Sequence, residues 1–207
     1  LLASILLSVS LIPILLTEIK APETDVQESL GLQALWKASP SGVATIGLSG
    51  LASAGFFGVG TIYAIKAGLS VSETALFMTL FIGFGAASQW PLGWLSDKID
   101  RRKVILLCCA SVICICIVLA SFEFTSKILL ILSALVGACT LPLYSLGVAQ
   151  ANDRLEPKQM ISASGTIVLV FSVFAALGPF TMSYFLEQFE MFGFMLYMCI
   201  VHLVIAV

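Results

Sequence analysis

The sequence predicts an all-α fold, a polytopic bundle of transmembrane helices. Of its 207 residues, 59% are hydrophobic and only 11% are charged, and the mean hydropathy is +1.08. A soluble domain is about a quarter charged, and a soluble fold of this size could not bury so much apolar surface. Continuous apolar runs such as residues 104–122 exclude a transmembrane β-barrel, whose strands alternate in polarity.

The apolar segments follow one another with polar residues between them. A span needs about 20 apolar residues, so the chain has room for six helices and a remnant. The opening run, residues 1–16, has no basic region before it, so we expect the end of a transmembrane helix and not a signal peptide. Full spans are expected at 41–67, 74–95, 104–122, 128–150 and 160–186, and a truncated last span at 191–207.

The one long polar stretch, residues 17–40, is predicted to be a linker. Thr24 to Gln27 fits a helix capping box, and apolar residues recur after it at near-helical spacing. These are Val26, Leu30, Leu35 and Trp36. We expect a short amphipathic helix lying on the membrane surface. A flexible linker with chance spacing is the alternative.

Basic residues predict the orientation. Eight of the ten Lys and Arg residues lie in the linker and in the third and fifth loops, and only Lys66 and Lys127 lie in the loops between. The positive-inside rule places the basic-rich loops in the cytoplasm. All three tryptophans, Trp36, Trp90 and Trp94, lie near the same face, where indole rings favour the membrane interface.

The six cysteines all lie in apolar runs and are expected to be reduced packing residues. A metal site is the alternative for the group Cys108, Cys109, Cys114 and Cys116. Only Cys109 and Cys116 share a helix face, and about two turns separate them. We therefore predict no metal and no cofactor, because zinc needs convergent ligands.

The third loop is the most informative segment. Residues 93–104 have the sequence GWLSDKIDRRKV. A glycine allows close helix approach, a carboxylate suits a helix N-terminus, and basic residues keep a loop cytoplasmic. These reasons do not require the fixed spacing of Gly93, Leu95, Asp97 and Arg101. The string resembles the G-x-L-[SA]-D-[RK]-x-G-R-[RK] loop of the major facilitator superfamily (MFS). Asp100 stands where that pattern has Gly, which leaves the turn geometry there open.

The chain is also similar to the YcaD-like subgroup of that superfamily. The similarity lies in Tyr63-Ala64 with residues 68–70 (GLS), in residues 89–93 (QWPLG) and in residues 151–153 (AND). The resemblance implies a six-helix half of an MFS fold. Residues 1–16 would end helix 6, residues 17–40 would form the cytoplasmic linker with its interfacial helix, and residues 41–207 would form helices 7–12.

The resemblance also implies the function, a secondary active transporter that moves a small molecule by alternating access, through symport or antiport. Its expected partners are a small-molecule substrate, the lipid bilayer and the N-terminal half of the same transporter, with no nucleic acid. The expected location is a bacterial inner membrane with the motif loop in the cytoplasm. A non-transporting receptor, scaffold or lipid-flipping protein on the same fold is the alternative.

For the motif loop, the resemblance implies a conformational latch made of Gly93, Leu95, Asp97, Lys98, Arg101, Arg102 and Asp153. Asp97 would dock on a helix N-terminus of the other half, and Arg101 would form an ion pair with Asp153. The alternative is that these are solvated charges that only orient the protein.

The resemblance places two helices beside the central cavity, and it suggests Phe56, Phe57, Tyr63, Thr140 and Tyr144 as substrate contacts. The glycines of the same helix are expected to serve packing. Pro142 and the pair Gly178-Pro179 are expected bend points, because proline removes a backbone donor. Gln89 should form an interhelical hydrogen bond.

No catalytic residues are expected, because the sequence has no H-E-x-x-H motif, no paired intramembrane Asp and no Ser-His constellation. The five complete spans also contain no Asp, Glu, Lys or Arg away from their ends. His202 is the one other titrating candidate, a possible proton carrier. If the transporter is proton-driven, we therefore expect the coupling carboxylate in its other half.

Overall fold

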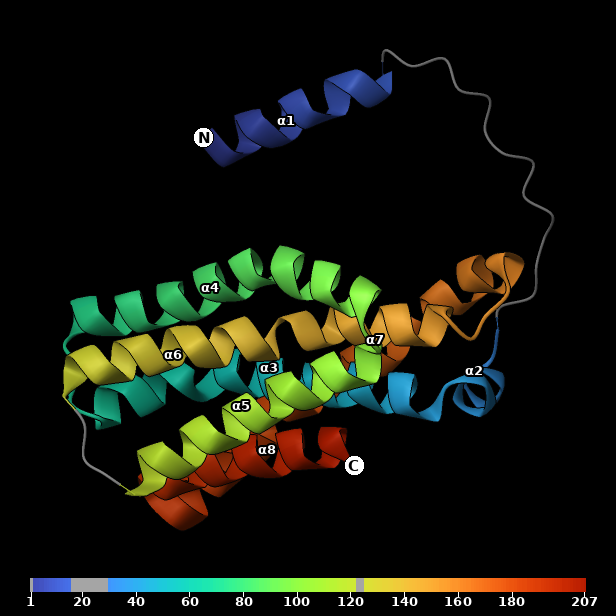
Figure 1. Cartoon of the computed structure of the whole chain (residues 1–207). Coiled ribbons are helices and arrows are strands. Elements are labelled where there is room, and N and C mark those ends of the chain that lie inside the picture. The colour runs from blue at the N-terminus through green and yellow to red at the C-terminus, as the bar shows by residue number, and fades with distance from the viewer. Residues whose placement is uncertain (1, 16–29, 122–124) are drawn as a thin grey trace.

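The computed structural model describes residues 2–15, 30–121 and 125–207. These residues form α-helices and no strands, which confirms the predicted fold class. The helices are α1 (Leu2–Leu15), α2 (Leu32–Ala38), α3 (Pro40–Lys66), α4 (Val71–Lys98), α5 (Arg101–Ser121), α6 (Ser126–Thr140), α7 (Pro142–Asn152) and α8 (Pro157–Ala206). Figure 1 shows α3 to α8 lying along one common direction.

Within the described residues, five helical segments are long and apolar enough to cross a membrane: α3, α4, α5, α6 together with α7, and α8. Each of the first four has the bounds predicted for a span, within a few residues. α6 and α7 form one span. The helical hydrogen-bond pattern is interrupted between them at Leu141, although the dihedrals of Leu141 are helical (φ −66°, ψ −35°), and Pro142, the expected bend point, follows directly. At Gly178-Pro179, by contrast, the helical backbone of α8 continues without a break.

α8 contains the two last predicted spans. A straight helix of 50 residues would be about 75 Å long, more than twice the hydrocarbon core. The chain instead turns back at Glu190, which has the non-helical dihedrals φ 51° and ψ −136°. The two limbs then pack against each other, and the Tyr197 hydroxyl lies 3.0 Å from the Thr181 hydroxyl.

Glu190 is the only described non-glycine residue with positive φ, a conformation that costs an L-residue about 1–3 kcal/mol. We expect Glu190→Gly to raise the free energy of unfolding by about 1 kcal/mol, because glycine adopts this region without strain. Thermal unfolding of the full-length protein in detergent measures the change. Glu187→Gly is the matched control, since Glu187 is helical and the substitution there should cost up to about 1 kcal/mol. Equal shifts for both variants would contradict the prediction.

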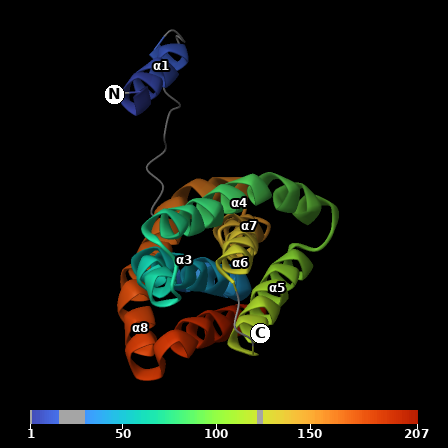
Figure 2. The same cartoon turned by 90° about the vertical axis from the view of Figure 1, so that its left-hand side faces the viewer.

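Seen along the bundle, α3 and the α6–α7 span occupy the middle, and α4, α5 and α8 surround them (Figure 2). α3 packs most closely on α8, and α6 on α4. Small residues allow these contacts. A Cβ added at Gly178 of α8 would lie 2.7 Å from both the Gly55 N and the Leu51 O of α3, so the two backbones nearly touch. Gly50 and Gly58 face α8 in the same way, as expected for packing glycines.

The end of the predicted linker is attached to the bundle. Leu30 donates from its backbone N–H to Ser162 O at 3.1 Å and accepts from the Thr166 hydroxyl at 2.6 Å. Leu35 of α2 is fully buried in a cluster with residues of α3, α7 and α8, whereas Trp36 is half exposed. Thr24, Val26 and Gln27, which the capping prediction involved, lie outside the described residues.

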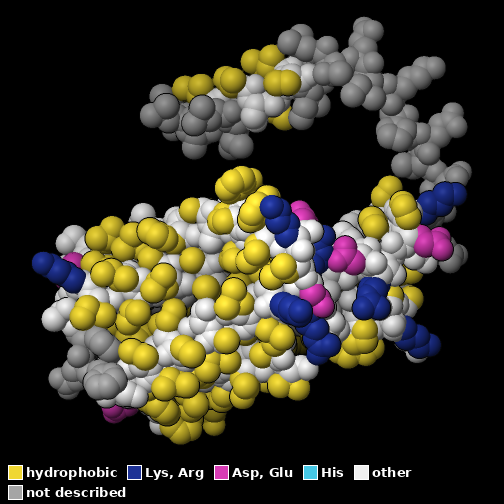
Figure 3. Space-filling view, in the orientation of Figure 1, with side chains coloured by type: hydrophobic (Ala, Val, Ile, Leu, Met, Phe, Trp, Pro, Cys, Tyr) yellow, Lys and Arg dark blue, Asp and Glu magenta, His cyan; other side chains and the backbone are white. Residues whose placement is uncertain are grey.

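Charged side chains gather at the two ends of the bundle and leave an apolar surface between them (Figure 3). Most of the basic side chains lie at one end, over the end of α4, the start of α5 and the α7–α8 connection. Exposed Ile, Leu, Val and Phe side chains cover the middle of α4, α5 and α8. Such an apolar surface is unfavourable in water and favourable in lipid, so the chain is an integral membrane protein.

Candidate functional site

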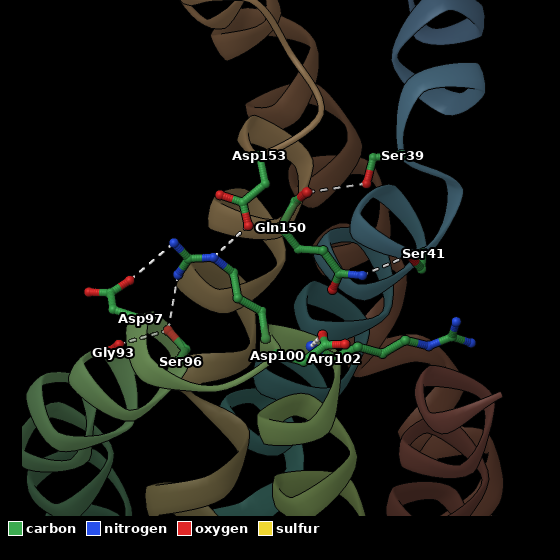
Figure 4. A network of polar contacts seen from close by, with 10 residues as sticks. Ser39, Ser41, Gly93, Ser96, Asp97, Asp100, Arg102, Gln150 and Asp153 are labelled. Carbon is green, nitrogen blue, oxygen red and sulfur yellow. Dashed lines mark hydrogen bonds and ion pairs between the residues drawn. The ribbon is translucent and has the colours of Figure 1, made fainter.

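Arg101, the first residue of α5, is the centre of the polar network at the basic end. Figure 4 shows its partners Ser96, Asp97 and Asp153. Its Nε donates to Asp153 Oδ2 at 2.6 Å, so the ion pair predicted from the sequence is confirmed. One terminal nitrogen donates to the Ser96 hydroxyl at 3.0 Å, and the other lies 3.0 Å from Asp97 Oδ1. Each nitrogen of the guanidinium group thus has its own partner, which joins α4, α5 and the end of α7.

This network is partly solvated. The Arg101 side chain is 23% exposed, and those of Asp97 and Asp153 are 67% and 51% exposed. Ion pairs of this exposure contribute at most about 1 kcal/mol to stability. The planar arginine does, however, fix the direction of each contact. The arrangement is therefore better suited to choosing between conformations than to holding the bundle together.

Asp100 departs from the motif pattern, and the structure explains how it is accommodated. Its Oδ1 accepts the backbone N–H of Arg102 at 2.9 Å, and its carbonyl accepts the N–H of Lys103 at 2.9 Å. Asp100 is therefore the N-cap of α5, a position that aspartate favours. The turn needs no positive φ there, since Glu190 alone among the described non-glycine residues has one.

The remaining motif residues surround this centre. The Gly93 carbonyl accepts the Ser96 hydroxyl at 2.7 Å, so Ser96 both donates within α4 and accepts from Arg101. Leu95 packs against the apolar contact between α5 and α7. The Lys98 ammonium lies 3.7 Å above the Trp94 ring, a cation–π contact. Arg102 is exposed, and its one side-chain hydrogen bond to the described residues is a 3.5 Å contact with Val207 O.

A second connection ties α7 to the start of α3. Gln150 Nε2 donates to the Ser41 hydroxyl at 2.8 Å, and the Ser39 hydroxyl lies 3.4 Å from Gln150 O (Figure 4). Ser96, Gln150, Ser41 and Ser39 were not predicted as site residues. Ser96 lay within the motif and could have been included. The other three come from distant segments without any motif, so the sequence contained no signal for them.

The network borders an open groove of about 480 Å³. Its charged lining is balanced, because Arg101, Arg102 and Arg154 are matched by Asp97, Asp100 and Asp153. A groove with equal numbers of both signs has no strong preference for an anion or a cation.

Three of the suggested substrate contacts are buried inside the bundle. Phe56 is stacked on Phe81 with ring centroids 3.7 Å apart, and Tyr63 is stacked on Phe194 at 4.2 Å. Phe56 and Tyr63 border an internal cavity of about 20 Å³, which is room for a single water and not for an organic substrate. Thr140 is 1% exposed and lies 3.2 Å from His202 Nε2.

The other two suggested contacts keep accessible surface. Phe57 is 45% exposed and meets the Phe81 ring edge-on. Tyr144 is half-buried, with its ring 4.6 Å from that of Phe171. Among the five suggested contacts, these two side chains are the ones that keep exposed surface in this conformation.

The hydrogen bond expected for Gln89 does not form within the described residues. Gln89 is exposed on α4 and makes no hydrogen bond to the described part of the chain. Its neighbour Ser88 makes the interhelical bond instead, donating to Ala138 O of α6 at 2.7 Å. Ser88 lies on the face of α4 that packs on α6, and Gln89 lies on an exposed face. Which face turns inward is decided by the packing of α4 on α6.

Comparison with known proteins gives a consistent result. The family model "Major Facilitator Superfamily" matches residues 4–207. A protein of Salmonella arizonae named "Uncharacterized MFS-type transporter YcaD" is 26% identical over 171 residues, covering 82% of this chain and 44% of that protein. Proteins of the same name from Escherichia coli and Shigella sonnei are 25% identical over 182 residues, covering 87% of this chain and 47% of theirs. This chain thus spans about half the length of these relatives. No solved structure is a significant match.

Proposed function

The chain belongs to the major facilitator superfamily, and on that premise we propose that the full-length protein is a secondary transporter that moves a small molecule by alternating access. Residues 41–207 are its C-terminal six-helix bundle, which works together with an N-terminal half of the same protein. Residues 1–16 end helix 6, and residues 17–40 link the halves. The protein resides in a bacterial inner membrane.

One observation supports this function most directly, the convergence of three segments on Arg101. The guanidinium group bonds Ser96 and Asp97 at the end of α4 and Asp153 after α7. These solvated contacts contribute little stability but have strict geometry. They can therefore close in one state of the transporter and open in another. We propose that Asp97, whose carboxylate is largely exposed, docks on the N-terminal half in the cytoplasm-closed state.

The substrate is proposed to be small and without high charge. Phe57 and Tyr144 are the accessible members of the suggested cavity wall, and both are uncharged. Phe56 and Tyr63 would reach a substrate only after helices rearrange, because the cavity beside them is about 20 Å³. The same holds for Thr140, which is 1% exposed. Aromatic walls of this kind favour organic molecules with apolar surface.

The experiment that tests the function uses the full-length protein in proteoliposomes. A panel of small neutral and singly charged organic compounds is first screened for those that raise its unfolding temperature. Uptake and counterflow of each radiolabelled hit are then measured. Accumulation above that of protein-free liposomes supports transport. Binding without counterflow for every hit would favour the alternative, a receptor, scaffold or lipid-flipping protein on this fold.

The proposed topology gives a separate prediction. Single cysteines replacing Arg101 and Lys127 in an otherwise cysteine-free full-length protein should react from opposite sides of the membrane. In intact cells a membrane-impermeant maleimide should label position 127 and not position 101, and in inside-out vesicles the pattern should reverse. A cysteine at the exposed Lys66 is the matched control for position 127. Labelling of positions 101 and 127 from the same side would refute the topology.

If the proposed transporter is proton-coupled, its coupling carboxylate lies in the other half of the protein. Burying a charged side chain costs several kcal/mol, so coupling groups are rare and specific. His202 is fully buried between the Thr140 hydroxyl and the Met198 carbonyl, and no carboxylate of the described residues pairs with it. We propose that a coupling carboxylate, where one is used, comes from the N-terminal half.

A further inference from the structure

The helical hydrogen-bond pattern has a break between α6 and α7, which leaves one backbone carbonyl without its helical partner. Pro142 has no N–H, and the residue that would have received that hydrogen bond, four positions earlier, is Ala138. In lipid an unpaired carbonyl is costly, so a neighbour is expected to supply a donor. The Ser88 hydroxyl of α4 does so, at 2.7 Å from Ala138 O. Its contact with Gly85 O in its own helix is longer, 3.0 Å.

A second side chain, that of His202, forms a hydrogen bond beside this break from another helix. Thr140, the last residue of α6, lies 3.2 Å from Nε2 of His202 in the second limb of α8. His202 Nδ1 is 2.8 Å from Met198 O. A carbonyl can only accept, so Nδ1 carries the proton and the neutral ring accepts the Thr140 hydroxyl at Nε2. Both residues are almost completely buried.

α7 connects this break to the Arg101 network. It has 11 residues and is therefore about 16 Å long. Its first residue is Pro142, and Asp153, which bonds Arg101, follows its last. A small change of angle at Leu141 would displace Asp153 by a larger distance, because α7 moves as one rigid rod.

We infer that Ser88 and His202 are positioning residues, which set the angle of α7 at Leu141 and so bring Asp153 to Arg101. Ser88 acts through Ala138 and His202 acts through Thr140, from two different helices. This inference deepens the proposed function and rests on it where transport is concerned.

The test measures how often the α7–α8 connection, residues 153–156, detaches from the bundle. Arg154 is exposed, but Leu155 on the other side of the scissile bond is buried, so we expect trypsin to cleave after Arg154 mainly when this segment opens. The full-length protein is reconstituted with its cytoplasmic side outward, and fragments are identified by mass spectrometry. Ser88→Ala and the isosteric Thr140→Val are expected to raise the cleavage rate roughly three- to tenfold, the effect of losing one hydrogen bond. Thr140→Ser keeps the hydroxyl and should retain the original rate.

Ser133→Ala is the matched control. Ser133 also bonds from α6 to α4, donating to Phe77 O at 3.1 Å, but far from the break. The Ser133→Ala variant should lower the unfolding temperature and leave the cleavage rate after Arg154 unchanged. Asp153→Asn should raise cleavage by itself, and adding Thr140→Val should raise it little further, because both act on one contact.

A cleavage rate that rises equally in Ser133→Ala would overturn the inference, as would unchanged rates in Ser88→Ala and Thr140→Val. The assay needs no substrate, so failure to observe transport does not affect it. Once a substrate is known, the two variants should change the maximal rate more than KM. An effect on KM alone would also contradict a positioning role.

Discussion

Gly178→Ala is expected to destabilise the bundle severely, by about 3 kcal/mol or more. The new methyl group would lie 2.7 Å from two backbone atoms of α3, the Gly55 nitrogen and the Leu51 carbonyl oxygen. Backbone cannot rotate away as a side chain can, so the two helices must separate. Overpacking of a tight core typically costs about 1–3 kcal/mol, and separation also loosens the remaining contacts. The Leu51 carbonyl would lose its bond from the Tyr197 hydroxyl, which is now 3.0 Å long.

Gly165→Ala in the same helix is the matched control. A Cβ at Gly165 meets nothing within 4 Å. Alanine forms helix more readily than glycine by up to about 1 kcal/mol, so this variant should be neutral or more stable. The measurement is the unfolding temperature of the purified full-length protein, together with its yield from membranes. Shifts of the same sign and size in both variants would show that backbone contact between α3 and α8 is not what holds these helices.

Arg101→Lys is expected to disrupt the cytoplasmic network nearly as much as Arg101→Ala. Lysine keeps the charge but has a single nitrogen, which cannot reach Ser96, Asp97 and Asp153 together. A difference of about 1 kcal/mol between two conformations changes their ratio roughly fivefold. Both variants should therefore shift the protein away from the state in which the network is closed.

Spin labels on the exposed Lys158 and on a cytoplasmic loop of the other half would report the two populations through their distance distribution. Arg102→Lys is the control, because Arg102 has the same charge and its one side-chain hydrogen bond to the described residues is a 3.5 Å contact. It should leave the distribution unchanged. If Arg101→Lys behaves like the parent protein, charge alone matters and the solvated-charge alternative is correct.

The sequence predicted the helices well for a local physical reason. Lipid requires long apolar helices, and polar residues mark where they leave the membrane, so each span could be delimited by composition. The interruption at Pro142 was also predictable, because a missing N–H is a property of the residue itself. The Arg101–Asp153 pair was reached by resemblance, and its 2.6 Å contact is confirmed.

The directions in which side chains point could not be predicted in this way. Gln89 was expected to bond across helices, yet it is exposed and its neighbour Ser88 makes the bond. Phe56 and Tyr63 were suggested as cavity wall, and they lie against other rings around a cavity of about 20 Å³. In each case the residue type was informative, but the sequence did not show which face of the helix turns into the bundle.

The sequence by itself therefore determined the class of the protein, the order and bounds of its spans and the motif loop. Only the tertiary structure decided which faces meet, as in the bonds of Ser88 and Thr140 to other helices and the contact between Gly178 and α3. The reason is the solvent. In water a helix is apolar only where it is buried, so its pattern reveals its inner face. In lipid both faces are apolar, and close packing of the backbones determines which one turns inward.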